Sequence, residues 1–182
     1  MSYCLYCANQ PIDSLHRLYH DEHYGFPISC DNELFGRLIL EINQAGLSWD
    51  TILKKEEGFR KAYSDFNIAE IAQYNEDKVN ELMLDSSIIR NKLKIQSVIH
   101  NARRVCQFQE DYGGFSLWIE SFGKQSTENW VKIFRKEFKF VGKEIVVEFL
   151  MSAGFLKGAH IESCPVFEKI LEKKPNWLSH EK

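Results

Sequence analysis

The sequence contains no apolar run close to the roughly 18 residues that a membrane-spanning helix requires. Residues 1–10 lack the basic flank and the apolar core of a secretory signal. Strict alternation of apolar and polar residues, the pattern of a half-buried strand, is essentially absent, and so are repeats and low-complexity tracts. These absences predict a cytoplasmic all-α protein without a membrane partner.

The chain is long enough for one domain with a substantial core. It has 182 residues, of which 44% are hydrophobic and 27% charged, as in an ordinary globular protein. The five cysteines are an odd number and no export signal accompanies them, which favours a reducing compartment and thiols that are free or bound to a metal.

The distribution of basic residues favours a nucleic-acid partner, although the formal net charge of −3 argues weakly against one. Residues 86–109 contain no acidic side chain. The basic residues form two clusters: Arg90, Lys92, Lys94, Arg103 and Arg104, and then Lys132, Arg135, Lys136, Lys139 and Lys143. Positive faces on an acidic body suit phosphate contact, whereas a single cluster is more commonly a solvated helix face.

Helical periodicity dominates from Asp31 onward, and residues 1–30 are predicted to be irregular. We expect a long helix over 89–109 and a strongly apolar one over 143–153, which Gly154 ends. Short polar residues precede most of the expected helices and predict these N-caps: Asp31 or Asn32, Ser48, Asn67, Asn75 and Thr127.

Glu41 occupies an unusual position, because it stands among Ile39, Leu40 and Ile42 near the end of the first expected helix. Gly46 then breaks the helix, and Trp49 follows the break. Periodicity alone leaves two interpretations of Glu41 open, a solvent-exposed side chain or a buried carboxylate that needs a partner.

Cysteine and histidine residues at both ends of the chain suggest a metal site. Cys4 and His20 lie near the N-terminus, and His160 and Cys164 have the i, i+4 spacing of two ligands on one helical face. Together they would form a closed tetrahedral Cys2His2 zinc site, which supports structure rather than catalysis. Cys7 and His23 are rival ligands, and the alternative is a set of unrelated free thiols and surface histidines.

Two further features point to recognition of DNA and of a flat ring. Phe140, Val141 and Gly142 form a short turn between two expected helices, and Lys143 follows, so that backbone N–H groups could bind a phosphate. An ordinary helix cap is the competing interpretation. The aromatic residues Tyr3, Tyr6, Tyr19, Tyr24, Phe26 and Trp49 could form, with Glu41, a stacking pocket for an extruded base.

Together these residues resemble the bacterial Tag family of DNA-3-methyladenine glycosylases over nearly the whole chain. The stretches that carry the resemblance are Tyr19 to Gly25, Leu40 to Trp49, Thr51 to Lys55, Ile88 to Asn91 and Phe138 to Gly142. The resemblance implies a helix-hairpin-helix glycosylase fold, in which one structural zinc ion joins the two termini. It selects Cys4, His20, His160 and Cys164 as the zinc ligands and makes Cys7 a bystander.

The resemblance also implies roles in the base pocket. Glu41 matches the pocket carboxylate, Trp49 a stacking residue and Tyr19 a pocket tyrosine. His16 stands where the family has a second pocket tyrosine, Tyr6 where it has a tryptophan, and Tyr24 where it usually has another tryptophan. These departures leave the fold and the zinc site intact and concern the choice of substrate.

The resemblance further implies hydrolysis of the N-glycosidic bond of 3-methyladenine in double-stranded alkylated DNA, with the free base and an abasic site as products. We expect a monomer with one domain over 1–182, in which 1–30 and 155–182 are zinc-linked termini and 31–154 is the helical body. The alternatives are a non-catalytic zinc-stabilised module that binds damaged DNA, a glycosylase with shifted lesion specificity, and a zinc hydrolase that uses His23 or Glu22.

Overall fold

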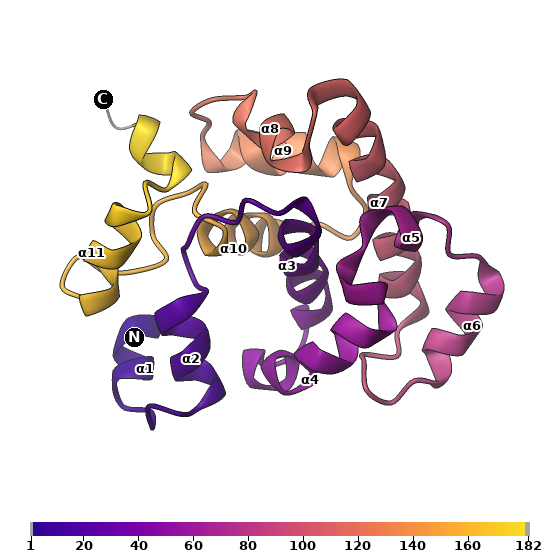
Figure 1. Ribbon diagram of the computed structural model, residues 1–182, viewed down its shortest axis with the longest axis horizontal. Helices are drawn as coiled ribbons and strands as arrows, with labels where there is room; N and C mark the ends of the chain where they lie inside the picture. Colours follow the sequence, from indigo (N-terminus) through magenta and orange to yellow (C-terminus); the bar gives the residue numbers. More distant parts are fainter. Residues whose placement is uncertain (1, 181–182) are drawn as a thin grey trace.

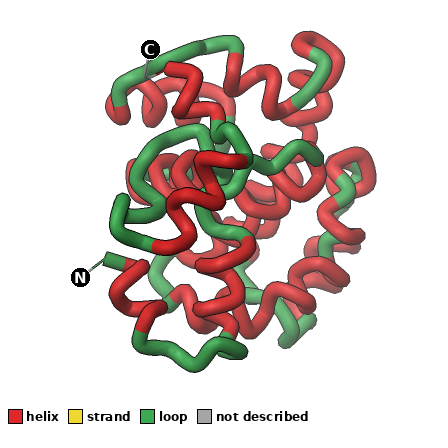
Figure 2. The backbone as a smooth tube through the Cα atoms, turned by 60° about the vertical axis from the view of Figure 1, so that its left-hand side comes forward, coloured by secondary structure: helices red, strands yellow, loops and turns green. Residues whose placement is uncertain are grey.

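The computed structural model describes residues 2–180, and within that range the chain is all-helical and contains no strand. The connections are turns and loops (Figure 2). The elements are α1 (Tyr3–Ala8), α2 (Leu15–Glu22), α3 (Asp31–Gln44), α4 (Trp49–Ala62), η1 (Ser64–Phe66), α5 (Ile68–Ala72), α6 (Glu76–Leu84), α7 (Lys92–Tyr112), α8 (Phe115–Glu120), α9 (Thr127–Glu137), α10 (Lys143–Ser152), α11 (Pro165–Glu172) and η2 (Asn176–His180).

Helix α3 lies at the centre of the molecule, beside α10 (Figure 1). Helices α1, α2 and α11 lie on one side of this pair and α4 to α7 on the other, while α8 and α9 cover its top in that view. Every residue of α3 from Leu34 to Asn43 is buried, because neighbouring helices pack around it. The apolar residues of α3 are therefore buried, as periodicity predicts, and the polar residues between them are buried as well.

The predicted caps at Ser48, Asn67 and Asn75 are confirmed, since each side chain accepts a hydrogen bond from a backbone N–H in the first turn of its helix. The cap predicted at Thr127 belongs to Ser126. The prediction for the first helix was wrong in a more informative way. Asp31 accepts from the backbone N–H of Phe115, at 2.8 Å, and so caps α8, which lies far away in the sequence.

Two other expectations need correction. Residues 1–30 are not irregular, because they contain α1 and α2, which begin after the caps Ser2 and Ser14. The long helix begins three residues later than expected, after the cap Asn91, and ends at Gly113, whose φ of 84° is left-handed. Helices α1 and α2 were missed because each has too few turns for periodicity to reveal it.

The main apolar core extends from α3 to the residues after α10, and a second cluster joins Cys4 of α1 to α11 and Trp177. A third, small cluster of Tyr19, Tyr24 and Leu53 lies among α2, the loop after it and α4. No helix among residues 2–180 has the length and apolarity to cross a bilayer.

Gly36 of α3 is essential for the packing of Phe66. A Cβ atom at residue 36 would lie 2.7 Å from Cγ of Phe66 and closer still to Cδ2. We expect Gly36→Ala to lower the free energy of unfolding by about 1–3 kcal/mol through overpacking, against the intrinsic preference of helices for alanine. Denaturant unfolding measures the change. Gly142→Ala is the control, because a Cβ there meets no atom within 4 Å, and its effect should stay within about 1 kcal/mol. Equal stability of Gly36→Ala and the parent chain would contradict the packing argument.

Candidate functional site

Glu41 is buried in the structure, with 2% of its surface exposed. No described residue donates a hydrogen bond to its carboxyl group, and it takes part in no ion pair within the described chain. Burial first, and then the negative charge of Glu148, raise the pKa of Glu41 to about 8, against the lowering effect of Arg37. A desolvated carboxyl group with free hydrogen-bonding capacity is costly and is typical of a ligand site.

Glu41 lines a pocket of about 280 Å³, close to the lower end of the roughly 300–1,000 Å³ found for small-molecule sites. The lining residues come from α1, α2, the loop after it, α3, α4 and α10: Tyr3, Tyr19, Tyr24, Glu41, Gln44, Trp49 and Glu148. The pocket is thus mainly aromatic and contains two carboxyl groups, a combination that suits a flat ring with hydrogen-bond donors.

Tyr19 and Trp49 form one side of the pocket, with ring centroids 5.1 Å apart and an interplanar angle of 59°. Arg37 supports Tyr19 from behind: its Nη1 donates to the Tyr19 hydroxyl at 3.0 Å and to the Ser152 carbonyl oxygen at 3.3 Å. The Nε1 atom of Trp49 is buried and has no hydrogen-bond partner among the described residues.

His16 and Tyr6 do not line the pocket. His16 Nδ1 lies 3.0 Å from the hydroxyl of Tyr3, which does line it. Tyr6 packs edge-on against His16 with centroids 5.1 Å apart, and 40% of its surface is exposed. His16 therefore contacts the hydroxyl of Tyr3, and the ring of Tyr6 stacks on the ring of Tyr3, so both residues support Tyr3 without lining the pocket.

Sequence reasoning missed Gln44 and Glu148 as lining residues. Glu148 Oε1 accepts a hydrogen bond of 2.6 Å from the hydroxyl of Tyr24, which the aromatic pattern had included. The signal that singled out Glu41 was present here too, because Glu148 is the only charged residue between Ile145 and Leu150 in α10. Only the packing of α10 against α3 shows that both carboxyl groups face one pocket.

A groove of about 530 Å³ continues from this pocket to the turn between α9 and α10. Its lining includes Glu41, the residues from Gln44 to Leu47 and those from Gly142 to Ile145. Gly142 is the N-cap of α10 and makes no side-chain cap, and the space beside it is open. The first N–H groups of α10 thus border the same groove as Glu41, as anion binding at a helix N-terminus requires.

The four residues of the predicted DNA-binding turn differ in their surroundings. Val141 is buried and Phe140 packs against the main core, whereas Lys143 is exposed. The left-handed residue of the turn is Phe140, with a φ of 58°, and not Gly142. Asn101 holds the turn in place, since its side chain accepts from the Lys139 N–H at 2.8 Å and donates to the Lys139 carbonyl at 3.0 Å.

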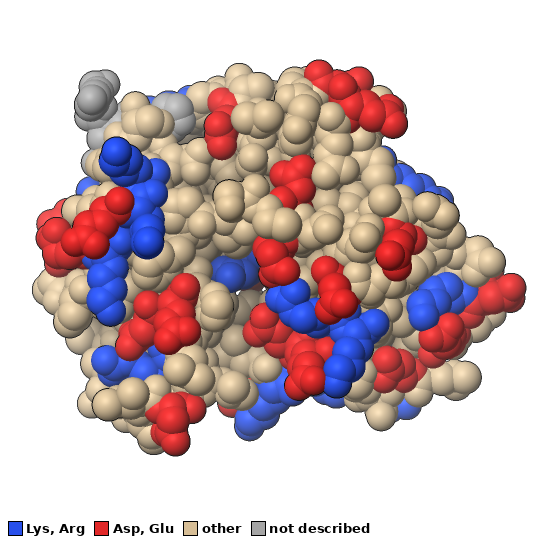
Figure 3. Space-filling model, in the orientation of Figure 1, with Lys and Arg blue, Asp and Glu red and all other residues tan. Residues whose placement is uncertain are grey.

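Most of the first basic cluster is engaged within the protein. Lys94 is buried, and its Nζ donates to the carbonyl oxygens of Asn43 and Ala45 at the end of α3, at 2.9 and 2.8 Å. The other internal contacts are Lys92 with Glu76, Arg103 with the carbonyls of Ala72 and Tyr74, and Arg104 with Glu137. The face shown in Figure 3 carries intermingled charges of both signs.

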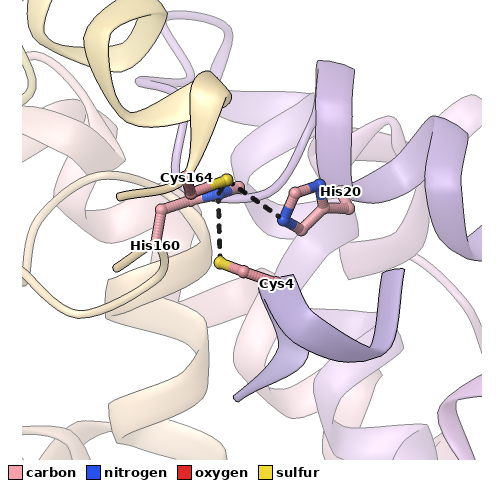
Figure 4. A group of neighbouring side chains, drawn as sticks. All are labelled: Cys4, His20, His160 and Cys164. Carbon is pink, nitrogen blue, oxygen red and sulfur yellow. Dashed lines mark hydrogen bonds between the residues drawn. The ribbon is translucent and has the colours of Figure 1, made fainter. Parts of the chain in front are cut away.

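Cys4, His20, His160 and Cys164 form a buried cluster in which all four ligand atoms lie within 4.8 Å of one another. The side chains converge from α1, α2 and the segment before α11 (Figure 4). Three adjacent pairs are separated by 3.6 Å (Cys4–His160), 3.4 Å (His160–Cys164) and 3.7 Å (Cys164–His20). Tetrahedral zinc with sulfur and nitrogen ligands spaces its ligand atoms by about 3.3–3.8 Å, so the residues fit such an ion.

The surroundings of the cluster favour a cation. His20 Nδ1 lies 2.6 Å from Asp21 Oδ1, and His160 Nε2 lies 2.8 Å from the Tyr24 carbonyl oxygen, which leaves the other nitrogen of each ring to face the cluster. Burial lowers the pKa of His160 to about 4 and raises the pKa of the Cys4 thiol. The histidine is therefore neutral, as a ligand must be, and a thiolate here needs a compensating charge.

The spacing argument for His160 and Cys164 was wrong in one respect. The segment between them forms bends and turns, and Cys164 is the N-cap of α11, so the two side chains do not share a helical face. Neither rival ligand belongs to the cluster. The Cys7 thiol instead donates to the His16 carbonyl oxygen at 3.5 Å.

Comparison with known proteins agrees with this geometry. Residues 7–136 match the family model for methyladenine glycosylase. DNA-3-methyladenine glycosylase 1 of Escherichia coli is 32% identical over 171 residues, which cover 84% of this chain and 91% of that protein. DNA-3-methyladenine glycosylase of Haemophilus influenzae is 29% identical over 166 residues, 81% of this chain and 89% of that protein.

Two solved structures have the same fold over most of the chain. The crystal structure of a 3-methyladenine DNA glycosylase I has a TM-score of 0.78 and 32% identity, and the match covers 87% of this chain and 97% of that one. The enzyme from Staphylococcus aureus has a TM-score of 0.77 and 31% identity, over 88% and 95% of the two chains. The all-helical fold and the match over most of the sequence lead to one conclusion: this chain belongs to the methyladenine glycosylase family.

Proposed function

We propose that this chain is a DNA glycosylase of base-excision repair that releases 3-methyladenine from alkylated double-stranded DNA. The observation that carries the proposal is the aromatic pocket with the buried, unpaired carboxyl group of Glu41. Membership of the family supports the same activity, and so does the similarity to a 3-methyladenine DNA glycosylase I structure in complex with 3-methyladenine, with a TM-score of 0.81 and 28% identity over 91% of this chain.

The chemistry of the lesion determines what the pocket must do. Methylation at N3 gives adenine a positive charge, so the base leaves as a neutral molecule when the N-glycosidic bond breaks. Water then forms the new bond to C1′, and an abasic site remains. The protein needs to extrude the nucleotide and recognise the base, and it needs little general-acid assistance.

Glu41 accepts hydrogen bonds from the donor edge of the base in this proposal, and Trp49 and Tyr19 stack on its faces. A cationic ring between aromatic side chains gains cation–π attraction as well as stacking. His16 and Tyr6 act on the base indirectly, through the position of Tyr3.

The turn from Phe140 to Lys143 is proposed as the DNA-binding hairpin of a helix-hairpin-helix unit formed by α9 and α10. The unfilled N-terminus of α10 supports this role, because the N–H groups of a helix start bind a phosphate. Phe140 and Val141 anchor the turn in the core, and Gly142 and Lys143 face the phosphate.

The Cys2His2 cluster is proposed to bind one structural zinc ion. Zinc there would cross-link the two ends of the chain, and the four protein ligands leave no open position for a hydrolase mechanism. We further propose a cytoplasmic monomer with one domain, in which 1–30 and 155–182 are the zinc-linked termini and 31–154 the body. The free thiols support a reducing compartment.

Substitution of the pocket residues tests the proposed activity. We expect Glu41→Gln and Trp49→Ala to lower the release of 3-methyladenine from methylated duplex DNA about a hundredfold or more, because each removes a contact with the extruded base. Chromatography of the released base measures the rate. Glu57→Gln is the control, since that carboxylate is exposed and pairs with Lys61. Normal turnover by both pocket variants would refute the assigned roles.

Although Glu41→Gln should lower activity, we expect it to raise the free energy of unfolding. The pKa of Glu41 is raised from its ordinary 4.5 to about 8, so the carboxyl group ionises more readily in the unfolded chain. The parent protein therefore loses stability between about pH 4.5 and 8, by up to a few kcal/mol, whereas the glutamine variant does not. Thermal unfolding at pH 5 and pH 8 should show the variant gaining most at the higher pH.

Removal of the proposed zinc tests the cluster. Saturation about a thousandfold above Kd stabilises a folded chain by about 4 kcal/mol, so we expect a chelator to lower Tm by roughly 8–16 °C. Metal analysis of Cys4→Ser and Cys164→Ser should show the loss of one zinc ion per chain. Cys30→Ser, in which an exposed cysteine changes, should keep it. An unchanged Tm in chelator would be incompatible with a structural ion.

The hairpin proposal predicts a change in salt dependence. Lys143→Ala should weaken binding to undamaged duplex DNA and reduce the slope of log K against log salt by about 1, because one phosphate contact is lost. Gly142→Ala should weaken binding about tenfold, since its methyl group would occupy the open space beside the helix start. Lys61→Ala, on the exposed face of α4, is the control. Unaltered binding by both hairpin variants would show that DNA docks elsewhere.

A further inference from the structure

Two carboxyl groups face one small aromatic pocket. Glu41 comes from α3 and Glu148 from α10, and both line the 280 Å³ pocket and the groove that continues from it. The negative charge of Glu148 is strong enough at Glu41 to oppose its ionisation. Two charges of the same sign cost free energy in a desolvated site, so Glu41 stays mainly protonated below about pH 8. A positive charge bound between the two carboxyl groups would stabilise both of them in the ionised form.

Glu148 has a defined position. The hydroxyl of Tyr24 donates to its Oε1 at 2.6 Å, and Tyr24 itself is buried. The backbone around Tyr24 is fixed in turn, because the Tyr24 carbonyl contacts His160 and the Gly25 N–H donates to the Ser152 carbonyl at 2.8 Å. Glu148 thus presents an oriented carboxylate to the pocket.

No cation among the described residues forms an ion pair with either carboxyl group. Arg37 is the basic residue that acts on Glu41, and its Nη1 is engaged by the Tyr19 hydroxyl and the Ser152 carbonyl. Its attraction lowers the pKa of Glu41 by less than burial and Glu148 raise it. The protein therefore leaves the negative charge of the pocket uncompensated.

We propose that Glu148 is a second base-recognition residue, which together with Glu41 makes the pocket selective for bases that carry positive charge. The inference rests on the proposed glycosylase function and adds to it a residue that determines specificity. A cationic base is attracted by the carboxylate of Glu148. A neutral base of the same shape must also lose its hydration on entering the pocket, but it gains no such attraction.

This role predicts an effect on substrate binding more than on bond cleavage. As the glycosidic bond breaks, the positive charge moves from the base to the sugar, so an interaction with the charged base is strongest before the transition state. Loss of the charge at Glu148 should therefore raise KM and change kcat less. The neutral product no longer attracts the carboxylate, which favours its release.

The test compares a cationic base with a neutral one of the same shape. We expect Glu148→Gln, which keeps the size and the acceptor for Tyr24, to lower kcat/KM for release of 3-methyladenine from methylated duplex DNA about tenfold, mainly through KM. Its affinity for duplex DNA with 3-methyl-3-deazaadenine, a neutral isostere, should change less than about twofold. The exposed-residue variant Glu57→Gln should match the parent chain in both assays.

Tyr24→Phe provides a second variant in which the carboxylate remains but its support is lost, and we expect a loss of about threefold in the same direction. Glu148→Gln should also lower the apparent pKa that Glu41 contributes to the pH profile, because the substitution removes the negative charge that opposes ionisation of Glu41. Unchanged kcat/KM in Glu148→Gln, or equal losses for the cationic and the neutral base, would overturn the proposal. Absence of base release by the parent chain would instead refute the proposed function, so the two failures are distinguishable.

Discussion

The burial of Glu41 in the central helix is the constraint around which this structure is organised. Helix α3 packs on all sides, and it contains a carboxyl group at a position that an apolar residue would fill at lower cost. The rings of Tyr19 and Trp49 shape the cavity in front of that group. The ammonium group of Lys94 donates hydrogen bonds to the carbonyl oxygens at the C-terminal end of α3. This contact is favourable because the C-terminus of a helix carries a partial negative charge. The burial of Glu41 thus lowers the stability of the fold, and the apolar packing around α3 offsets that loss.

The Cys2His2 cluster supports the same pocket from behind. His20 follows Tyr19 directly in α2, and His160 contacts the carbonyl oxygen of Tyr24. An ion that fixed the two histidines would therefore fix the two tyrosine rings as well. This arrangement explains how short helices from the two ends of the chain can form one wall of a precise site, although α1 and α2 have little apolar core of their own.

The groove between Glu41 and Gly142 connects base recognition with the proposed contact to the DNA backbone. Helix α10 contributes at both ends of this groove, since its N-terminus borders the outer part and Glu148 the inner part. A base that leaves the duplex near the turn would enter the pocket along a single helix. Lys94, Arg103 and Arg104 of α7 instead bind groups of the protein itself.

The sequence by itself determined the helical class and the helix caps at Ser48, Asn67 and Asn75, because these depend on local patterns. The family resemblance, and not residue spacing, selected the four residues of the Cys2His2 cluster. Its motifs also identified Glu41, Tyr19 and Trp49 together. Tertiary structure decided the rest. Asp31 caps a distant helix, Lys94 of α7 is buried against the end of α3, and His16 contacts Tyr3 without lining the pocket. Only the packing of α10 against α3 brings Glu148 beside Glu41, since the charge balance of a buried site depends on every helix that borders it.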